Sequence, residues 1–390
     1  MTGWITSLLL LGGWACAAAA QDAIVVGAVV SESGAHAGPA AEYRQGLLLW
    51  QDDINAAGGL LGRRVELRLK DDGSEAVRAG PAYAELIEGG AQVLIGPYGS
   101  AATLTASSEA ERARRVLLNA AGPSSLIYKR APRYVVQTAP PYAAYGQGPL
   151  ELADKAAAES LYILARDDVA SREMAEAALA QASRFSFGKV KLAVFSGTTN
   201  DFLEQLYEAM KVQADAWIAF GEVRDAADML KTLKRQGFVP KLLYLRASAD
   251  PGFVKLVGQD AEHVLGSREY EARLQRGDNA RFVKAYRAKW SAMPGEMAAA
   301  AYTAGTILAA AAAKAGTVDA DKLRAALSQL ELDTLLGRYR IDPSTGAQIG
   351  MQPAVVQRVE GRLEPVWPEA LAAGRDLAPF VAWAERKVIR

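Results

Sequence analysis

The stretch AQVLIGPYGSAATLTASSEAERARRVLLNAAGPSS, residues 91–125, decides the expected fold. Its apolar run at 93–95 predicts a buried strand, which the GPYG turn ends, and Ser100 stands where the N-cap of the next helix belongs. A second strand is predicted at 116–118, followed by a turn of small residues at 120–125. In a parallel α/β sheet both turns lie at the carboxyl ends of strands, where such sheets bind ligands. The stretch therefore predicts half of a small-molecule site.

The chain before this stretch alternates strand and helix. Residues 23–30 (AIVVGAVV) read as a strand that is apolar on both faces, and 63–70 as a second strand. Amphipathic helices are predicted at about 39–57 and 75–88. Strand-helix-strand-helix-strand indicates a right-handed, doubly wound parallel sheet.

The alternation restarts after a short strand at 134–137 and a helix at about 142–158. Further strands are predicted at 161–164, 191–195, 216–219 and 242–245, with helices at about 171–183, 202–212 and 226–236 between them. The pattern then becomes helical, at about 279–290, 296–315 and 320–329, and ends in short extended segments. The uncharged run 297–313 is rich in Ala, Gly and Thr and too short to span a bilayer, so we expect a packed helix there.

The bulk composition excludes some partners. The 390 residues include 44 basic and 44 acidic side chains, so no net field draws the chain to nucleic acid or to an anionic membrane. We expect neither as a partner.

The N-terminus has the pattern of a secretory signal peptide. A short apolar core at 5–14 precedes Ala18-Ala19-Ala20, and we expect cleavage after about Ala20 and export to the periplasm. The only cysteine, Cys16, lies inside this segment. A lipoprotein anchored at Cys16 is the alternative, which the residues GWA before it fit poorly. Cleavage after Ala20 would remove Cys16 and leave a mature chain with no thiol and no disulfide.

Several segments in order resemble the periplasmic solute-binding proteins of hydrophobic amino-acid ABC transporters, the Leu/Ile/Val-binding type. They are IVVGAVV at 24–30, DDINAAGGLLGRRVEL at 52–67, KDDGS at 70–74, QVLIGPYGSAAT at 92–103, FVKAYRAKW at 282–290 and AAAAYTAGTIL at 298–308. The resemblance implies a type I periplasmic-binding fold, an α/β fold of two doubly wound parallel-sheet lobes joined by a three-segment hinge, with a ligand cleft between them.

The same resemblance implies where the lobes divide. The N-terminal lobe would comprise 21–139 and 270–350, and the C-terminal lobe 140–269 and 351–390. Hinge crossings are expected near 139–141, 268–270 and 350–351.

The resemblance also implies the first half of the site. Ser100 matches a serine whose hydroxyl holds the ligand carboxylate, and the N-terminus of its helix would add unpaired N–H donors and partial positive charge. Gly122 and Ser124 match the second turn, and we include Tyr98 and Ala121 from the same two turns. The alternative is that Ser100 only caps its helix and Ser124 its turn.

The second half departs from the family pattern. Arg246 stands where amino-acid binders place a carboxylate for the ligand ammonium, and it would attract an anion instead. Glu222 falls where an aromatic residue is common and is expected to contact the ligand or to pair with Arg246. Arg246 as an ordinary surface arginine is the alternative. These departures predict a carboxylate ligand that need not carry an α-ammonium, such as an organic or aromatic acid.

An enzyme is not predicted. The two histidines, His36 and His263, have no metal-ligand spacing, and no nucleophile elbow, Walker A loop or dinucleotide fingerprint is present. We therefore expect no catalytic residue, metal or cofactor. The resemblance implies a monomer that closes on a small ligand and delivers it to an ABC transporter permease. An exported sensor that reports the ligand to a signalling system is the alternative.

Overall fold

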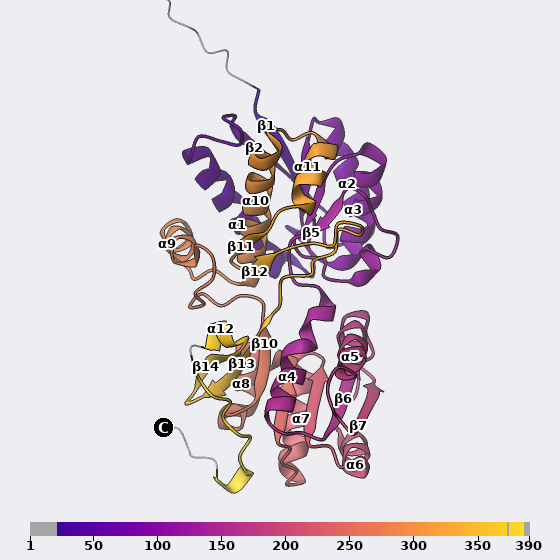
Figure 1. The fold of residues 1–390 in the computed structure, drawn as a ribbon. Coiled ribbons are helices and arrows are strands. Elements are labelled where there is room, and N and C mark those ends of the chain that lie inside the picture. Colours follow the sequence, from indigo (N-terminus) through magenta and orange to yellow (C-terminus); the bar gives the residue numbers. More distant parts are fainter. Residues whose placement is uncertain (1–21, 373, 386–390) are drawn as a thin grey trace, which may run out of the picture.

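The computed structural model describes residues 22–372 and 374–385, which form two lobes, each built around one β-sheet (Figure 1). The predicted signal peptide, its cleavage site and Cys16 lie outside the described residues. Three connections carry the chain between the sheets, after β5, after β10 and after β12. The exact division of the chain into lobes stays a prediction.

The first lobe contains a parallel five-stranded sheet in the order β2-β1-β3-β4-β5. Its strands are β1 (Ile24–Val30), β2 (Val65–Asp71), β3 (Val93–Ile95), β4 (Leu117–Asn119) and β5 (Val135–Gln137). Every residue of β1, β3, β4 and β5 is buried, as is typical of a parallel sheet covered on both faces. The strand order reverses at β1, so the turns after β1 and β3 flank the crevice where such sheets bind ligands.

Helices cover both faces of this sheet. Those of the first lobe are α1 (Ala37–Ala56), α2 (Ala76–Glu88), α3 (Ser100–Ala113), α9 (Asn279–Trp290), α10 (Glu296–Ala315) and α11 (Ala320–Ser328). Side chains of α1, α9, α10 and α11 share one core with the sheet, and α2 and α3 form the core of the other face. A short hairpin of β11 (Leu332–Thr334) and β12 (Gly337–Tyr339) follows α11.

The uncharged helix is α10, and it packs against α1. A Cβ at Gly305 would lie 2.2 Å from the Trp50 ring, and one at Gly46 would lie 2.3 Å from the carbonyl oxygen of Ala298. By length and composition α10 is the one described helix that could cross a membrane, yet 67% of its apolar window is buried inside the protein. The predicted packed helix is therefore confirmed.

The second lobe contains a seven-stranded sheet in the order β14-β13-β10-β9-β8-β6-β7. Its strands are β6 (Ser160–Arg166), β7 (Lys189–Phe195), β8 (Ala216–Phe220), β9 (Leu242–Leu245), β10 (Leu265–Arg268), β13 (Ala354–Val359) and β14 (Arg362–Trp367). Five of these strands are parallel, whereas β13 and β14 add an antiparallel edge. The extended segments expected near the C-terminus thus complete the second sheet.

The helices of the second lobe are α4 (Gln147–Lys155), α5 (Val169–Ala182), α6 (Leu203–Lys211), α7 (Val223–Arg235), α8 (Pro251–Val257) and α12 (Glu369–Ala372). Short 3₁₀ turns are η1 (Ser125–Ile127), η2 (Tyr142–Tyr145), η3 (Arg246–Ala249), η4 (Gly258–Ala261) and η5 (Trp383–Glu385). The single helix predicted at 142–158 is wrong, because Pro149 has no N–H for the carbonyl of Tyr145. The chain instead forms η2 and then α4, which places Pro149 in the first turn of α4.

Candidate ligand-binding site

The turn between β3 and α3 is shaped by Gly99. Gly99 has φ 91°, which favours glycine, and it is the N-cap of α3, so Ser100 is the first helical residue rather than the cap. The Ser100 hydroxyl oxygen makes no cap bond and accepts a hydrogen bond from the backbone N–H of Ser124 at 3.1 Å. Ser100 therefore joins the two predicted turns of the site.

The second turn, after β4, is organised by Asn119. Its side chain accepts from the N–H of Gly122 at 2.8 Å and donates to the Gly122 carbonyl at 2.6 Å. A Cβ at Gly122 would lie 2.5 Å from Thr103 Oγ1, so the turn needs glycine. The carbonyl of Ala121 accepts from the N–H of Gly99 at 3.0 Å. Both polar backbone groups of Gly122 are thus used inside the protein.

A carboxylate from the second lobe already binds this turn. The Ser124 hydroxyl donates to one oxygen of Glu173, on α5, and the N–H of Ser125 donates to the other at 2.9 Å. The buried Ser124 oxygen also accepts from the N–H of Leu126 at 3.2 Å. The turn therefore binds a carboxylate, as its donors suggest, but that carboxylate belongs to the chain itself.

Arg246 lies at the carboxyl end of β9 and is only partly exposed. Its Nη2 donates to the carbonyl of Gly221 at 3.3 Å, and its Nε is buried without an acceptor. Among the described residues, no carboxylate oxygen lies within 4.0 Å of its guanidinium. Arg246 is therefore a cation without an ionic partner on the wall of the second lobe.

The expected pairing of Glu222 with Arg246 is wrong. Glu222 caps α7 in a capping box with Asp225, and its side chain is 68% exposed. Its nearest cation is Arg166, at 3.6 Å, which also contacts Asp225 at 3.0 Å. The cap geometry places Glu222 beside Arg166.

Two glutamates that the sequence analysis missed lie where the chain returns to the first lobe. Glu269 follows β10 and accepts a hydrogen bond from the hydroxyl of Tyr145. Glu296 begins α10, accepts from the N–H of Glu269 at 3.2 Å, and lies 3.8 Å from Arg268. Burial, and secondly the charge of Glu296, raises the pKa of Glu269 to about 7, while Arg246 opposes this rise.

Two tyrosines connect these glutamates to the predicted site. Burial raises the pKa of Tyr98, and the charges of Glu269 and Glu296 raise it further. Burial raises the pKa of Tyr142 to about 12 although Arg246 opposes the rise, and Glu269 also raises it. Tyr98, from the first lobe, and Arg246, from the second, thus both influence the pKa of Tyr142, in opposite directions. No sequence motif marked Glu269, Glu296 or Glu173, because their partners are distant in the chain.

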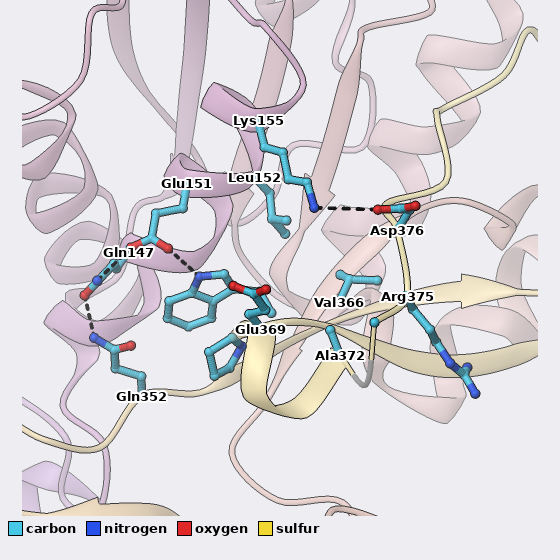
Figure 2. Close-up of a pocket in the computed structure, with 13 residues that line it drawn as sticks. Gln147, Glu151, Leu152, Lys155, Gln352, Val366, Glu369, Ala372, Arg375 and Asp376 are labelled. Carbon is cyan, nitrogen blue, oxygen red and sulfur yellow. Dashed lines mark hydrogen bonds and ion pairs between the residues drawn. The ribbon is translucent and has the colours of Figure 1, made fainter.

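A different pocket, of about 590 Å³, lies in the second lobe between α4 and the segment after β14 (Figure 2). Its polar side chains bind one another. Gln147 donates to Glu151 at 2.8 Å, and the indole N–H of Trp367 donates to Glu151 at 2.6 Å. None of the predicted site residues lines it. Within residues 22–372 and 374–385, no group of three or more His, Cys, Asp or Glu side chains is placed to hold a metal ion.

Solved structures of transport proteins share this fold. An ABC transporter substrate-binding protein from Desulfitobacterium hafniense, in complex with leucine, is 22% identical, with a TM-score of 0.72 over 88% of this chain and 100% of that chain. A solute-binding protein from Rhodopseudomonas palustris, in complex with 3,4-dihydroxybenzoic acid, is 22% identical, with a TM-score of 0.69 over 88% and 95%. The branched-chain amino acid binding protein LivJ from Streptococcus pneumoniae, in complex with isoleucine, is 21% identical, with a TM-score of 0.69 over 89% and 100%.

The sequence itself matches the model of one protein family over residues 23–362. That family is described as periplasmic binding protein, and its members bind solutes rather than transform them. The match spans both sheets, and the predicted type I fold is confirmed. This chain belongs to the periplasmic binding protein family.

Proposed function

We propose that the protein is the extracytoplasmic solute-binding component of an ABC importer. It captures a small carboxylate ligand, an amino acid or an organic or aromatic acid, between its two lobes and delivers it to the permease. The family supports a solute-binding role outside the cytoplasm. The bound molecules of the three solved relatives all carry a carboxyl group.

Arg246 is the observation that carries the proposal. A partly buried guanidinium without an ionic partner is electrostatically incomplete, and a ligand carboxylate would supply two charge-assisted hydrogen bonds to it.

Calorimetric titration with a panel of amino acids, aliphatic acids and aromatic acids tests this function. At least one carboxylate should bind the mature protein, and Arg246→Gln should weaken that binding. Arg224→Gln is the matched control, because its side chain is 85% exposed and its carboxylate neighbour, Asp228, lies at 3.7 Å. A protein that binds no member of the panel would contradict the proposal.

Closure and delivery need separate measurements. Small-angle scattering should show a smaller radius of gyration with ligand than without it, because ligand contacts to both lobes favour the closed form. Light scattering should give the mass of a monomer. Uptake of the bound solute by membrane vesicles that contain the permease should depend on added protein.

A further inference from the structure

Another pocket, of about 420 Å³, lies where the two lobes meet. The first lobe contributes the β11–β12 hairpin and the segment before α9, and the second lobe contributes the start of α12. The third connection between the sheets, at Gly350 and Gln352, completes the wall. Figure 1 shows the hairpin at the edge of one lobe and α12 at the facing edge of the other. None of the predicted site residues lines this pocket.

Close backbone contacts hold the first-lobe wall of the pocket in place. Gly277 has φ 47°, and a Cβ there would lie 2.9 Å from the carbonyl carbon of Thr334 in the hairpin. A Cβ at Gly350 would lie 2.5 Å from the carbonyl oxygen of Arg338. The segment before α9 and the third connection therefore pack directly on the backbone of the hairpin, which fixes the neighbouring residue, Arg276, at the pocket wall.

Arg276 is a cation of this pocket without an ionic partner among the described residues. Its Nη1 donates to the carbonyl of Leu336 at 3.3 Å and its Nη2 to the carbonyl of Gln352 at 3.5 Å. Both bonds are longer than is usual for an N–H donor, and a carbonyl carries no net charge. Burial lowers the pKa of the guanidinium to about 10, so the group is still charged at neutral pH. The pocket therefore contains a positive charge that is not neutralised.

The rest of the lining differs between the two lobes. In the hairpin, Arg338 contacts Asp333 at 3.1 Å and Glu331 at 2.8 Å, so these charges balance one another. On the second-lobe side three apolar residues line the pocket, namely Pro368, Ala370 and Leu371. A ligand with one anionic group and a short apolar body would match both sides.

We propose that this pocket binds a small organic anion, whose carboxylate or phosphate group pairs with Arg276 and whose apolar part lies against Pro368, Ala370 and Leu371. A planar guanidinium forms two parallel charge-assisted hydrogen bonds with either group. The bound anion contacts both lobes, because both supply walls of the pocket. This site is separate from the one proposed beside Arg246 and goes beyond the solute-binding function.

Calorimetry at low ionic strength with acetate, butyrate, hexanoate and butyl phosphate probes both parts of the ligand. The affinity of the carboxylates should rise by about two- to fourfold for each added methylene group, because each one buries apolar surface. The comparison of butyrate with butyl phosphate shows which anionic group is preferred. Hexan-1-ol, which has no charge to pair with Arg276, should bind at least about 10-fold more weakly than hexanoate.

Variants assign the binding to this pocket. Arg276→Gln should weaken binding of hexanoate and butyl phosphate by about 10-fold or more. Arg287→Gln, an exposed change on α9 outside the pocket, is the control for loss of one positive charge. Thermal unfolding of each variant shows whether it is folded.

A second pair of variants leaves Arg276 intact. Ala370 is exposed on α12, so a larger side chain is tolerated there without disturbing the core. Ala370→Glu places a negative charge in the pocket and should weaken anion binding more than Ala370→Gln, which has the same size and no charge. Equal affinities in these two variants would contradict the assignment to this pocket.

Arg246→Gln separates this site from the proposed solute site, and it should leave binding at Arg276 unchanged. If Arg246→Gln removes binding of hexanoate and butyl phosphate while Arg276→Gln does not, these anions occupy the solute site and no anion site exists at Arg276. If neither probe binds the folded wild-type protein, the anion site is also wrong. In both cases the solute-binding function stands, because the panel of solutes tests it independently.

Discussion

Glu173 binds Ser124 across the gap between the two lobes. The acceptor lies on α5 of the second sheet, and the donor lies in the turn after β4 of the first sheet. The neighbouring N–H of Ser125 donates to the second oxygen of the same carboxylate at 2.9 Å. Close beside it, the N–H of Tyr142 donates to the carbonyl of Pro123 at 3.1 Å. The Glu173 bonds join residues of the two lobes, so they favour an arrangement in which the lobes are close together.

Replacing Glu173 by glutamine should weaken closure. The amide keeps the size of the side chain but removes the charge that strengthens both hydrogen bonds. We expect ligand dissociation to become about threefold faster or more in stopped-flow measurements, with a larger radius of gyration in solution. Glu176→Gln, an exposed change on the same helix, should alter neither quantity. Unchanged dissociation in Glu173→Gln would show that this contact does not hold the lobes.

The raised pKa of Glu269 should make stability depend on pH. Its folded pKa, about 7, lies above the ordinary value of 4.5, chiefly because of burial. The stabilising contribution of the protonated acid is complete below about pH 4.5 and is lost as pH rises through 7. Tyr145, Glu296 and Arg246 face this carboxyl group, and Glu296 shares the direction of its shift.

Urea unfolding at a series of pH values measures this effect. The free energy of unfolding should fall between about pH 5 and pH 8, and Glu269→Gln should flatten that fall. Glu208→Gln is the control, and its free energy of unfolding should fall with pH as steeply as that of the wild type. Lys191 and Lys211 lower the pKa of Glu208 to about 2, so this carboxylate stays ionised across the range and its contribution to stability is lost only in strong acid. Identical slopes in wild type and Glu269→Gln would mean that Glu269 is ionised throughout this range.

Adding a methyl group at Gly305 should destabilise the first lobe. Its Cβ would lie 2.2 Å from the indole of Trp50, and a buried ring cannot move without disturbing the core. We expect Gly305→Ala to lower the free energy of unfolding by about 1–3 kcal/mol. Gly38→Ala, in α1, is the control because nothing lies within 4 Å of its Cβ position. Equal stability of the two variants would contradict the close packing of α1 on α10.

The hydroxyl of Tyr83 should contribute to the first sheet. It accepts from the N–H of Val29 at 3.2 Å and donates to the carbonyl of Ile95 at 2.5 Å, so it bridges β1 and β3. Tyr83→Phe leaves both buried backbone groups without a partner, and should cost about 1–3 kcal/mol in urea unfolding. Tyr207→Phe, at a side chain that is 54% exposed, should cost little. A Tyr83→Phe protein as stable as this control would show that the bridge adds nothing.

Much of the fold was predictable from local patterns. The predicted bounds of α9 and α10 match the structure. The predicted strands of both lobes also occur in the predicted order, because a strand buried on both faces consists mainly of consecutive apolar residues, which are visible in the sequence. The antiparallel edge of the second sheet was not predictable. β13 pairs with β10, some 90 residues earlier, and no local pattern specifies that partner.

The sequence by itself determined the family, the two α/β sheets and the small-residue turns at Gly99 and Gly122, because these depend on local residue types and their order. Only the tertiary structure decided how the site is charged. It bonds Glu173 to the first-lobe turn, leaves Arg246 without an ionic partner among the described residues and places Glu269 against the hydroxyl of Tyr145. The physical reason is that electrostatic energy depends on distance and burial in space, which residues from separate segments acquire only when the chain folds.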